Sequence, residues 1–416
     1  MDMKVIISNG SYKFHLSALA SELDKRKLLF KFITAGYPNF LYRLLFVFWK
    51  KNKSLKRLID RKEDIDEKKI FSINLSEIFF KAGDILSKKN KHIRERMYVL
   101  GYFLYEKKAN KFIINSKADI YHYRNCYGGQ TVINAQKRSI KTICDHSIAH
   151  PAAIEWMINN KGKIPPSEII SELKSSLVSH YKKMLLDLGN NDLIIVNSDF
   201  VKESLIHFGI DANRIYVVYL GVDDQFLIHL NNHIKRNLVL NNKILFAGGW
   251  QYRKGVLDLV EALSDAEFDW TLDIAGGSEY GLNNRPTVKA FIDSSNVNYL
   301  GILPREKLAE LMCTHQIFVF PSYCEGSARV IFEAMAAGLY IITTKNSGSI
   351  VQNGINGEII EPGNPTALKN AIQYALNNIE VVREIGLRNR KLILEKYTQK
   401  NYGDNILKVY KISDSN

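Results

Sequence analysis

In the second half of the chain, short apolar runs alternate with longer segments in which apolar residues recur every three or four positions. The runs are short enough to be buried strands, and the longer segments are typical of helices. Strands are predicted over 244–247, 271–275, 297–300, 317–320 and 339–343, and helices over 255–264, 286–295, 305–314 and 328–337. This alternation predicts a parallel α/β sheet covered on both faces, with ligands beyond the carboxyl ends of the strands.

The first half has a similar but less regular pattern. Strands are predicted over 5–8, 120–123, 141–145, 193–197 and 215–220, and residues 40–111 are predicted to be mostly helical. A chain of 416 residues exceeds what one core usually organises, so two Rossmann-like domains are expected. The predicted division is an N-terminal domain over 1–224, a polar linker over 225–242, a C-terminal domain over 243–396 and a final helix over 397–416.

Composition narrows the class of protein. With 46% hydrophobic and 24% charged residues, the chain is typical of a globular protein. It has no apolar run of 18 residues, and its N-terminus lacks the apolar core of a signal peptide. Its four cysteines form no C-x-x-C pair, which disfavours a zinc or thioredoxin-like site. A cytoplasmic protein with unpaired thiols is expected.

The positive charge is concentrated at the beginning of the chain. Residues 1–111 carry a net charge of +13 out of a total of +14. They include the apolar stretch 39–50, which precedes further lysines and is too short to span a bilayer. This region predicts either a core helix with a solvated basic surface or peripheral contact with an anionic membrane, at the inner face of the cytoplasmic membrane. No nucleic-acid motif accompanies it, so nucleic acid is not an expected partner.

The segment 320–338 is the most informative for chemistry. A predicted strand ends at Phe320, a loop carries Glu325, and Glu333 lies in the second turn of the following helix. The two carboxylates would be about 12 Å apart along a helix, roughly the length of a ribose–diphosphate–hexose unit. The free backbone N–H groups of Gly326, Ser327 and Ala328 would suit a diphosphate between them. From spacing alone, two ordinary solvated glutamates are an equally good interpretation.

The residue pattern of this segment resembles that of a known family. Pro321-Ser322, then Glu325-Gly326, six residues and Glu333-Ala-Met-Ala-Ala-Gly338, is similar to the Glu-x7-Glu signature of the retaining glycosyltransferases of family four. The segments 193–226, 246–255 and 348–362 also resemble that family. The resemblance implies the GT-B fold, in which two Rossmann-like domains face each other across a cleft and the C-terminal helix crosses back to the first domain. It also implies transfer of a sugar from a nucleoside diphosphate sugar to a hydroxyl, with retention of configuration.

The resemblance assigns roles to particular residues. Glu333 would bind the ribose, Glu325 would contact the donor sugar near its reacting carbon, and Lys254 would bind the diphosphate. The family usually has an arginine five residues before this lysine, where this chain has Gly249. Arg253 is the candidate replacement, and a surface charge is its alternative.

In the N-terminal domain, the glycine loop at Gly10 is a candidate phosphate contact, with an ordinary turn as the alternative. Family members commonly place a histidine at the cleft edge near the end of a strand, but Cys144 occupies that register here. His150 is the preferred candidate and His146 the second. A purely structural role is the alternative for both.

No Asp-x-Asp motif follows a predicted strand, and Asp223-Asp224 make a poor metal pair. No metal and no cofactor besides the nucleoside diphosphate sugar substrate are expected, and Arg253, Lys254 and the helix N-terminus would stabilise the leaving diphosphate. The expected acceptor is a glycan or a lipid-linked molecule, as in bacterial surface polysaccharide or glycolipid synthesis. A sugar-nucleotide epimerase, or a catalytically silent sugar-nucleotide-binding or membrane-scaffold protein, is the alternative that Gly249 leaves open.

Overall fold

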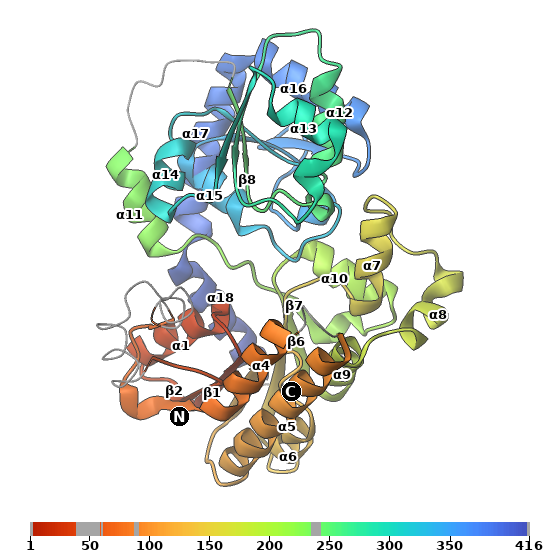
Figure 1. The fold of residues 1–416 in the computed structure, drawn as a ribbon. Coiled ribbons are helices and arrows are strands. Elements are labelled where there is room, and N and C mark those ends of the chain that lie inside the picture. The colour runs from red at the N-terminus through yellow and green to blue at the C-terminus, as the bar shows by residue number, and fades with distance from the viewer. Residues whose placement is uncertain (1–2, 39–58, 60, 87–90, 234–242, 414–416) are drawn as a thin grey trace, which may run out of the picture.

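The computed structural model describes residues 3–38, 59, 61–86, 91–233 and 243–413 (Figure 1). Two parallel sheets lie one above the other in this view, and helices cover both. The α/β fold class expected from the alternating pattern is therefore confirmed. The apolar stretch 39–50 lies outside the described residues.

The lower sheet has seven parallel strands in the order β3-β2-β1-β4-β5-β6-β7. These are β1 (Val5–Gly10), β2 (Leu29–Thr34), β3 (Ile70–Ser72), β4 (Ile120–Arg124), β5 (Lys141–His146), β6 (Leu193–Val196) and β7 (Ile215–Val217). Five of them were predicted, with small shifts at their ends, whereas β2 and β3 were missed. The order reverses at β1 and β4, so the carboxyl ends of these two strands form the switch point where ligands of such sheets bind.

The upper sheet has six parallel strands in the order β10-β9-β8-β11-β12-β13. These are β8 (Lys243–Ala247), β9 (Thr271–Ala275), β10 (Val297–Gly301), β11 (Ile317–Phe320), β12 (Tyr340–Thr344) and β13 (Gly357–Ile360). Here the order reverses at β8 and β11. The segments after these two strands carry the Lys254 and Glu325 motifs, which the sequence predicted at strand ends.

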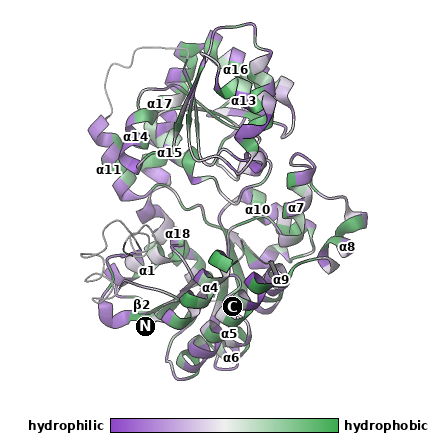
Figure 2. Ribbon diagram, in the orientation of Figure 1, coloured by the Kyte–Doolittle hydropathy of each residue, from purple (hydrophilic) through white to green (hydrophobic). Residues whose placement is uncertain are grey.

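Helices cover both faces of the lower sheet. One face packs against α1 (His15–Lys25) and α18 (Gln399–Ser413), and their side chains share one buried core. A second core on the other face includes α5 (Lys91–Ile114). Further helices are α4 (Asn74–Leu86), α6 (Gln130–Gln136), α7 (Pro151–Asn159), α8 (Ile170–Ser175), α9 (Ser179–Asn190) and α10 (Asp199–His207). Many of these helices mix hydrophobic and hydrophilic residues, as helices with one buried face do (Figure 2).

The chain returns to the lower sheet at its end. Tyr402, Ile406 and Tyr410 of α18 are buried in the core that α1 shares. The hydroxyl of Tyr410 lies 2.7 Å from Nδ1 of His122 on β4. The last helix therefore packs as part of the N-terminal half, although the upper sheet precedes it in the sequence (Figure 1).

The predicted linker 225–242 is wrong in its first half. Residues Asp224–His233 form helix α11, and its Phe226 and Leu230 are buried in the core of the upper sheet. These two residues are four positions apart, so they face the same side of the helix. Asparagine and histidine residues between them hid this short apolar stripe. Residues 234–242 lie outside the described residues.

Helices α12 (Val256–Ser264), α13 (Pro286–Ile292), α14 (Arg305–Met312), α15 (Arg329–Ala337), α16 (Pro365–Asn377) and α17 (Ile379–Lys396) complete the upper half. No described helix is both long enough and apolar enough to span a membrane.

Candidate functional site

The loop between β11 and α15 carries the first candidate carboxylate. The backbone N–H of Glu325 donates to the carbonyl of Asn346 at 2.9 Å, and that of Ala328 donates to the carbonyl of Ser347 at 2.9 Å. The side chain of Asn346 also donates to the carbonyl of Tyr323 at 2.8 Å. The segment after β12 therefore braces the loop before α15 begins. As a consequence the Ala328 N–H is not free, and only those of Gly326 and Ser327 remain as candidate anion donors.

Glu325 lies between two cations. Its Oε1 is 2.7 Å from Nη1 of Arg253 and 3.2 Å from Nζ of Lys254. The Lys254 ammonium also lies 4.7 Å from the centre of the Phe320 ring, at the end of β11. Both cations follow β8, and Gly255 after them has φ +69° with no room for a Cβ, which would lie 2.0 Å from the Pro321 carbonyl. The structure thus brings together Glu325, Arg253 and Lys254 at adjacent strand ends.

Glu333 is buried rather than exposed. It lies in the second turn of α15, and 6% of the residue is accessible to solvent. Its Oε1 lies 3.1 Å from Nη2 of Arg305, the first residue of α14. Burial raises the pKa of the Glu333 carboxyl, and the nearby Arg305 and Arg329 guanidinium groups oppose that rise.

Arg305 is a site residue that the sequence analysis missed. Its Nη2 also lies 2.5 Å from Oδ2 of Asp223, and Nη2 of Arg329 lies 2.9 Å from the same oxygen. Asp223, rejected as a metal ligand, instead joins these two arginines just before α11. Arg305 follows the β10 strand, at the same edge of the sheet as the Glu325 loop, and this was the only signal in the sequence.

The N-terminal domain contacts the Glu325 loop directly. Oγ of Ser198 donates to the carbonyl of Gly326 at 2.5 Å. A Cβ at Gly326 would lie 1.8 Å from the carbonyl oxygen of Ser147, which follows β5. Only glycine allows this close approach of the two backbones. Ser147 therefore marks where the two halves of the site meet.

A pocket of about 300 Å³, here called the strand-end pocket, lies on the N-terminal side of this contact. Its walls come from the residues that follow β1, β4 and β5, and from α5 and α9. Ser147 and Ile148 line it, so it adjoins the loop that carries Glu325. Arg124 also lines it and donates to the Ser11 carbonyl at 2.8 Å. A cavity at this place is what the switch point of the lower sheet predicts.

Asp145 lines the strand-end pocket and lies between two histidines that the sequence analysis did not single out. Its Oδ1 is 2.8 Å from Nε2 of His15, and its Oδ2 is 3.4 Å from Nε2 of His122. Burial alone would raise the pKa of the Asp145 carboxyl, but the two histidines hold it well below its usual range. Strands β4 and β5 and helix α1, far apart in sequence, are needed to assemble this group.

The expectation for Gly10 is not supported by its surroundings. Gly10 has φ +73°, and a Cβ there would lie 2.3 Å from the ring of Tyr127. Its N–H donates to the hydroxyl of Tyr105 at 3.2 Å. The glycine is required by close aromatic packing, and its N–H is not free to bind a phosphate.

The preference for His150 over His146 is also not supported by the surroundings of His150. His150 caps α7: its Nδ1 accepts from the N–H of Ala152 at 3.2 Å, and its ring stacks on Phe208 with 4.0 Å between centroids. The residue is 1% exposed, and burial lowers its pKa to about 3. Proline at the next position starts α7 in this register, so the histidine is a structural cap.

His146, the second choice, lines the strand-end pocket at the end of β5. Asn125 Nδ2 lies 2.7 Å from its Nδ1, and Nε2 has no hydrogen-bond partner among the described residues. Burial lowers the pKa of His146 to about 4, so the ring is neutral at neutral pH. With Nδ1 accepting from Asn125, the proton lies on Nε2, which can then donate to a bound oxygen.

The described residues contain no group of three or more histidine, cysteine or acidic side chains arranged to hold a metal ion. All four cysteines are buried and unpaired.

Comparison with known proteins agrees with this geometry. Residues 241–378 match the family model described as glycosyl transferases group 1, and residues 90–226 match that of glycosyltransferase family 4. The two matches together span more than half of the chain. A fold of two facing Rossmann-like sheets with this carboxylate and cation cluster defines a GT-B protein. The chain belongs to the group 1, family 4 glycosyltransferases.

Relatives are found in bacteria and archaea. An uncharacterized glycosyltransferase of Methanocaldococcus jannaschii is 28% identical over 331 residues, 75% of this chain and 89% of that protein. The N-acetyl-alpha-D-glucosaminyl L-malate synthase of Bacillus anthracis is 22% identical, covering 56% of this chain and 68% of that protein. A putative glycosyltransferase of Bacillus subtilis is 26% identical, and the match covers 64% of its length.

Solved structures share the fold at low identity. Sucrose-phosphate synthase of Thermosynechococcus elongatus superposes with a TM-score of 0.67 at 16% identity, covering 99% of both chains. The Anabaena protein HepE, solved with UDP and glucose, superposes with a TM-score of 0.59 at 15% identity, covering 98% of this chain and 99% of that one. These similarities establish the GT-B fold.

Proposed function

We propose that this glycosyltransferase moves a sugar from a nucleoside diphosphate sugar to an acceptor hydroxyl, with retention of configuration and without a metal ion. The observation that carries the proposal is the cluster of Glu325, Arg253 and Lys254 beside the start of α15, with Glu333 buried one turn further on. This cluster adjoins the strand-end pocket. The charged cluster suits a nucleoside diphosphate sugar donor, and the cavity that faces it suits an acceptor.

In this proposal the donor lies along α15. The Glu333 carboxylate accepts hydrogen bonds from the ribose hydroxyls, and the Arg305 guanidinium 3.1 Å away favours its ionised form against the effect of burial. Lys254 binds the diphosphate together with the free N–H groups of Gly326 and Ser327. The binding of UDP by the fold relative HepE supports a nucleotide at such a site.

The transfer step uses the charges around Glu325. The bond between the anomeric carbon and the diphosphate oxygen breaks, and the acceptor oxygen forms its bond on the same face of the sugar. The acceptor proton passes to the departing diphosphate. Lys254 and Arg253 stabilise the negative charge that develops there, while Glu325 stabilises the positive charge on the sugar. His146 donates from Nε2 to a sugar or acceptor oxygen in the strand-end pocket.

The acceptor is proposed to be a glycan or a lipid-linked molecule, in bacterial surface polysaccharide or glycolipid synthesis. The basic first quarter of the chain supports work at the surface of an anionic membrane, because each lysine or arginine near such a surface adds about 1 kcal/mol of attraction.

The test is incubation with radiolabelled UDP-, GDP- and ADP-sugars and a lipid and glycan extract, with and without EDTA. Incorporation that persists in EDTA, with the donor's anomeric configuration in the product by NMR, is the expected result. Glu325→Gln should abolish incorporation, and Glu384→Gln on α17 is the matched control. Interconversion of the donor would indicate an epimerase instead, and nucleotide binding without either reaction would indicate a silent binding protein.

A further inference from the structure

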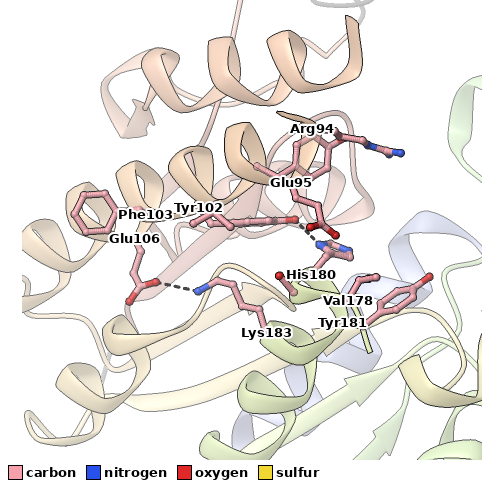
Figure 3. Close-up of a pocket in the computed structure, with 12 residues that line it drawn as sticks. Arg94, Glu95, Tyr102, Phe103, Glu106, Val178, His180, Tyr181 and Lys183 are labelled. Carbon is pink, nitrogen blue, oxygen red and sulfur yellow. Dashed lines mark hydrogen bonds and ion pairs between the residues drawn. The ribbon is translucent and has the colours of Figure 1, made fainter. Parts of the chain in front are cut away.

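A second cavity lies between α5 and the start of α9, with a volume of about 550 Å³ (Figure 3). This volume is within the range of about 300–1,000 Å³ typical of small-molecule sites. One wall is a helical stripe on α5 that includes Tyr98, Val99, Tyr102 and Phe103, and the opposite wall begins at Val178. We call it the α5–α9 pocket. Nothing in the donor chemistry requires such a cavity.

The rim of this pocket is apolar and open to solvent. Val99 is 53% exposed, Phe103 is 58% exposed and Val178 is 45% exposed. Val99 and Phe103 are four positions apart and so lie on the same face of α5. A helix that packs in the interior on its other sides does not need apolar residues on this face, and exposing them is unfavourable unless something covers them.

The α5–α9 pocket adjoins the strand-end pocket. Arg94, Tyr98, Tyr102 and His180 line both cavities. The hydroxyl of Tyr102 lies 2.7 Å from Nδ1 of His180, so these two side chains link α5 to α9 at the junction (Figure 3). Burial lowers the pKa of His180 to about 4, which leaves its ring uncharged at neutral pH. A long ligand could therefore extend from the reacting centre beside Ser147 to the apolar rim.

The positive charges lie near the polar end of this path. Arg94 lines both pockets and Arg124 lines the strand-end pocket. The Arg94 guanidinium lies 5.3 Å from the Tyr98 ring centre, and that of Arg124 lies 4.2 Å from the Phe14 ring centre. Neither forms an ion pair with a carboxylate within the described part of the chain. By contrast Lys183, which lines the α5–α9 pocket but not the strand-end pocket, is paired with Glu106 at 3.0 Å. The arrangement is complementary to a ligand with an anionic group followed by an apolar chain.

We propose that the acceptor is a lipid phosphate-linked sugar. Its sugar occupies the strand-end pocket, its phosphate lies near Arg94 and Arg124, and its apolar chain occupies the α5–α9 pocket. This inference rests on the proposed transferase function and selects the lipid-linked acceptor over a soluble glycan. The apolar chain of the lipid, or the membrane from which the lipid comes, then covers the exposed side chains of Val99, Phe103 and Val178.

Binding of farnesyl phosphate to the whole protein tests the inference. Calorimetry should detect binding of farnesyl phosphate, weaker binding of uncharged farnesol and none of inorganic phosphate. Phe103→Glu and Val99→Glu each place a carboxylate at the rim and should weaken farnesyl phosphate binding about tenfold or more, since a side chain of this size loses its apolar contact. Leu387→Glu on α17, where the native residue is 60% exposed, is the matched control and should bind like the native protein.

Two results would overturn the lipid inference: no binding of farnesyl phosphate, or equal loss in the control and the rim variants. Binding of UDP, GDP and ADP, measured on the same samples, reports separately on the donor site. Retained nucleotide binding with no lipid binding would leave the transferase proposal intact and point to a soluble glycan acceptor. If the native protein bound none of these nucleotides, that result would contradict the proposed function itself.

Discussion

Replacing Glu333 by glutamine tests the donor site most directly, because it keeps the shape of the side chain and removes its charge. The residue is 6% exposed and its carboxylate lies 3.1 Å from Arg305, so few waters compete for the carboxylate oxygens. A pair of ribose hydroxyls donating to it forms hydrogen bonds to a charged acceptor. Their loss is expected to cost about 1.5–3 kcal/mol of binding free energy, which corresponds to a rise in Kd of roughly 10- to 150-fold.

The stability of the variant separates a binding role from a structural one. A carboxyl group whose pKa is raised in the folded protein binds its proton more tightly there than in the unfolded chain. Its ionisation at higher pH therefore lowers the free energy of unfolding. Glu333→Gln cannot ionise, and Arg305 keeps Asp223 as a partner at 2.5 Å. The variant should thus be at least as stable as the native protein at neutral pH in urea denaturation.

The pH dependence gives a second readout. Native binding of a nucleoside diphosphate sugar, whose diphosphate has no proton to lose near neutral pH, should weaken as the pH falls through the raised pKa of Glu333. This loss should begin at a higher pH than for an ordinary glutamate, and it should be absent in Glu333→Gln. Isothermal calorimetry across the pH series measures both effects. Native-like affinity of the glutamine variant at neutral pH would refute the ribose assignment, and Glu384→Gln controls for the loss of a surface charge.

Three further substitutions test the contacts described above. Gly326→Ala would place a Cβ 1.8 Å from the Ser147 carbonyl, so it should separate the two halves at a cost of about 1–3 kcal/mol and lower kcat. The control Gly189→Ala, which has open space around the new Cβ, should leave kcat unchanged. Equal kcat for the two variants would show that the contact is dispensable. His146→Ala should lower turnover more than nucleotide affinity. His150→Ala should instead lower the free energy of unfolding by about 1–3 kcal/mol with little change in kcat. The opposite pattern would restore His150 as the cleft histidine.

How far the sequence could predict the fold depended on the length of each apolar run. Strand β11 was predicted at its true bounds because it is an uninterrupted buried apolar run between clear helices. Strand β2 has Lys31 at its centre, and β3 contains three residues, so the apolar pattern did not distinguish either strand from the neighbouring sequence. Both lie on the side of the sheet away from β4, where the sheet approaches its edge and burial is incomplete.

The candidate site divides in a similar way. Glu325, Glu333 and Lys254 were found because their motifs resemble those of a known family, and Arg253 because it is next to Lys254. Spacing alone left two solvated glutamates as an equally good interpretation. Arg305, and the group of His15, His122 and Asp145, come from separate units that only the strand order brings together. The preference for His150 overlooked a local signal: the proline after it makes His150 a helix cap, and this could be read from the sequence.

The position of Asp223 connects the donor site to the junction between the two sheets. The chain crosses between the sheets near Val222 and returns near Tyr397, and the two crossings are hydrogen-bonded to each other. The N–H of Val222 donates to the Tyr397 carbonyl at 2.9 Å, and the N–H of Gln399 donates to the Val222 carbonyl at 3.0 Å. A Cβ at Gly221 would lie 2.3 Å from the same Tyr397 oxygen, so the crossings pack backbone against backbone.

This junction limits how the two halves can move, because any relative rotation must keep the two crossings together. Asp223 is the next residue after Val222, and Arg305 links it to Glu333 through contacts of 2.5 and 3.1 Å. The buried carboxylate on α15 and the junction therefore share one cation. On the other side of the cleft, Gly326 meets Ser147 without a side chain between them. A ligand along α15 would thus lie between a fixed junction at its Glu333 end and a close, glycine-dependent contact at its Glu325 end.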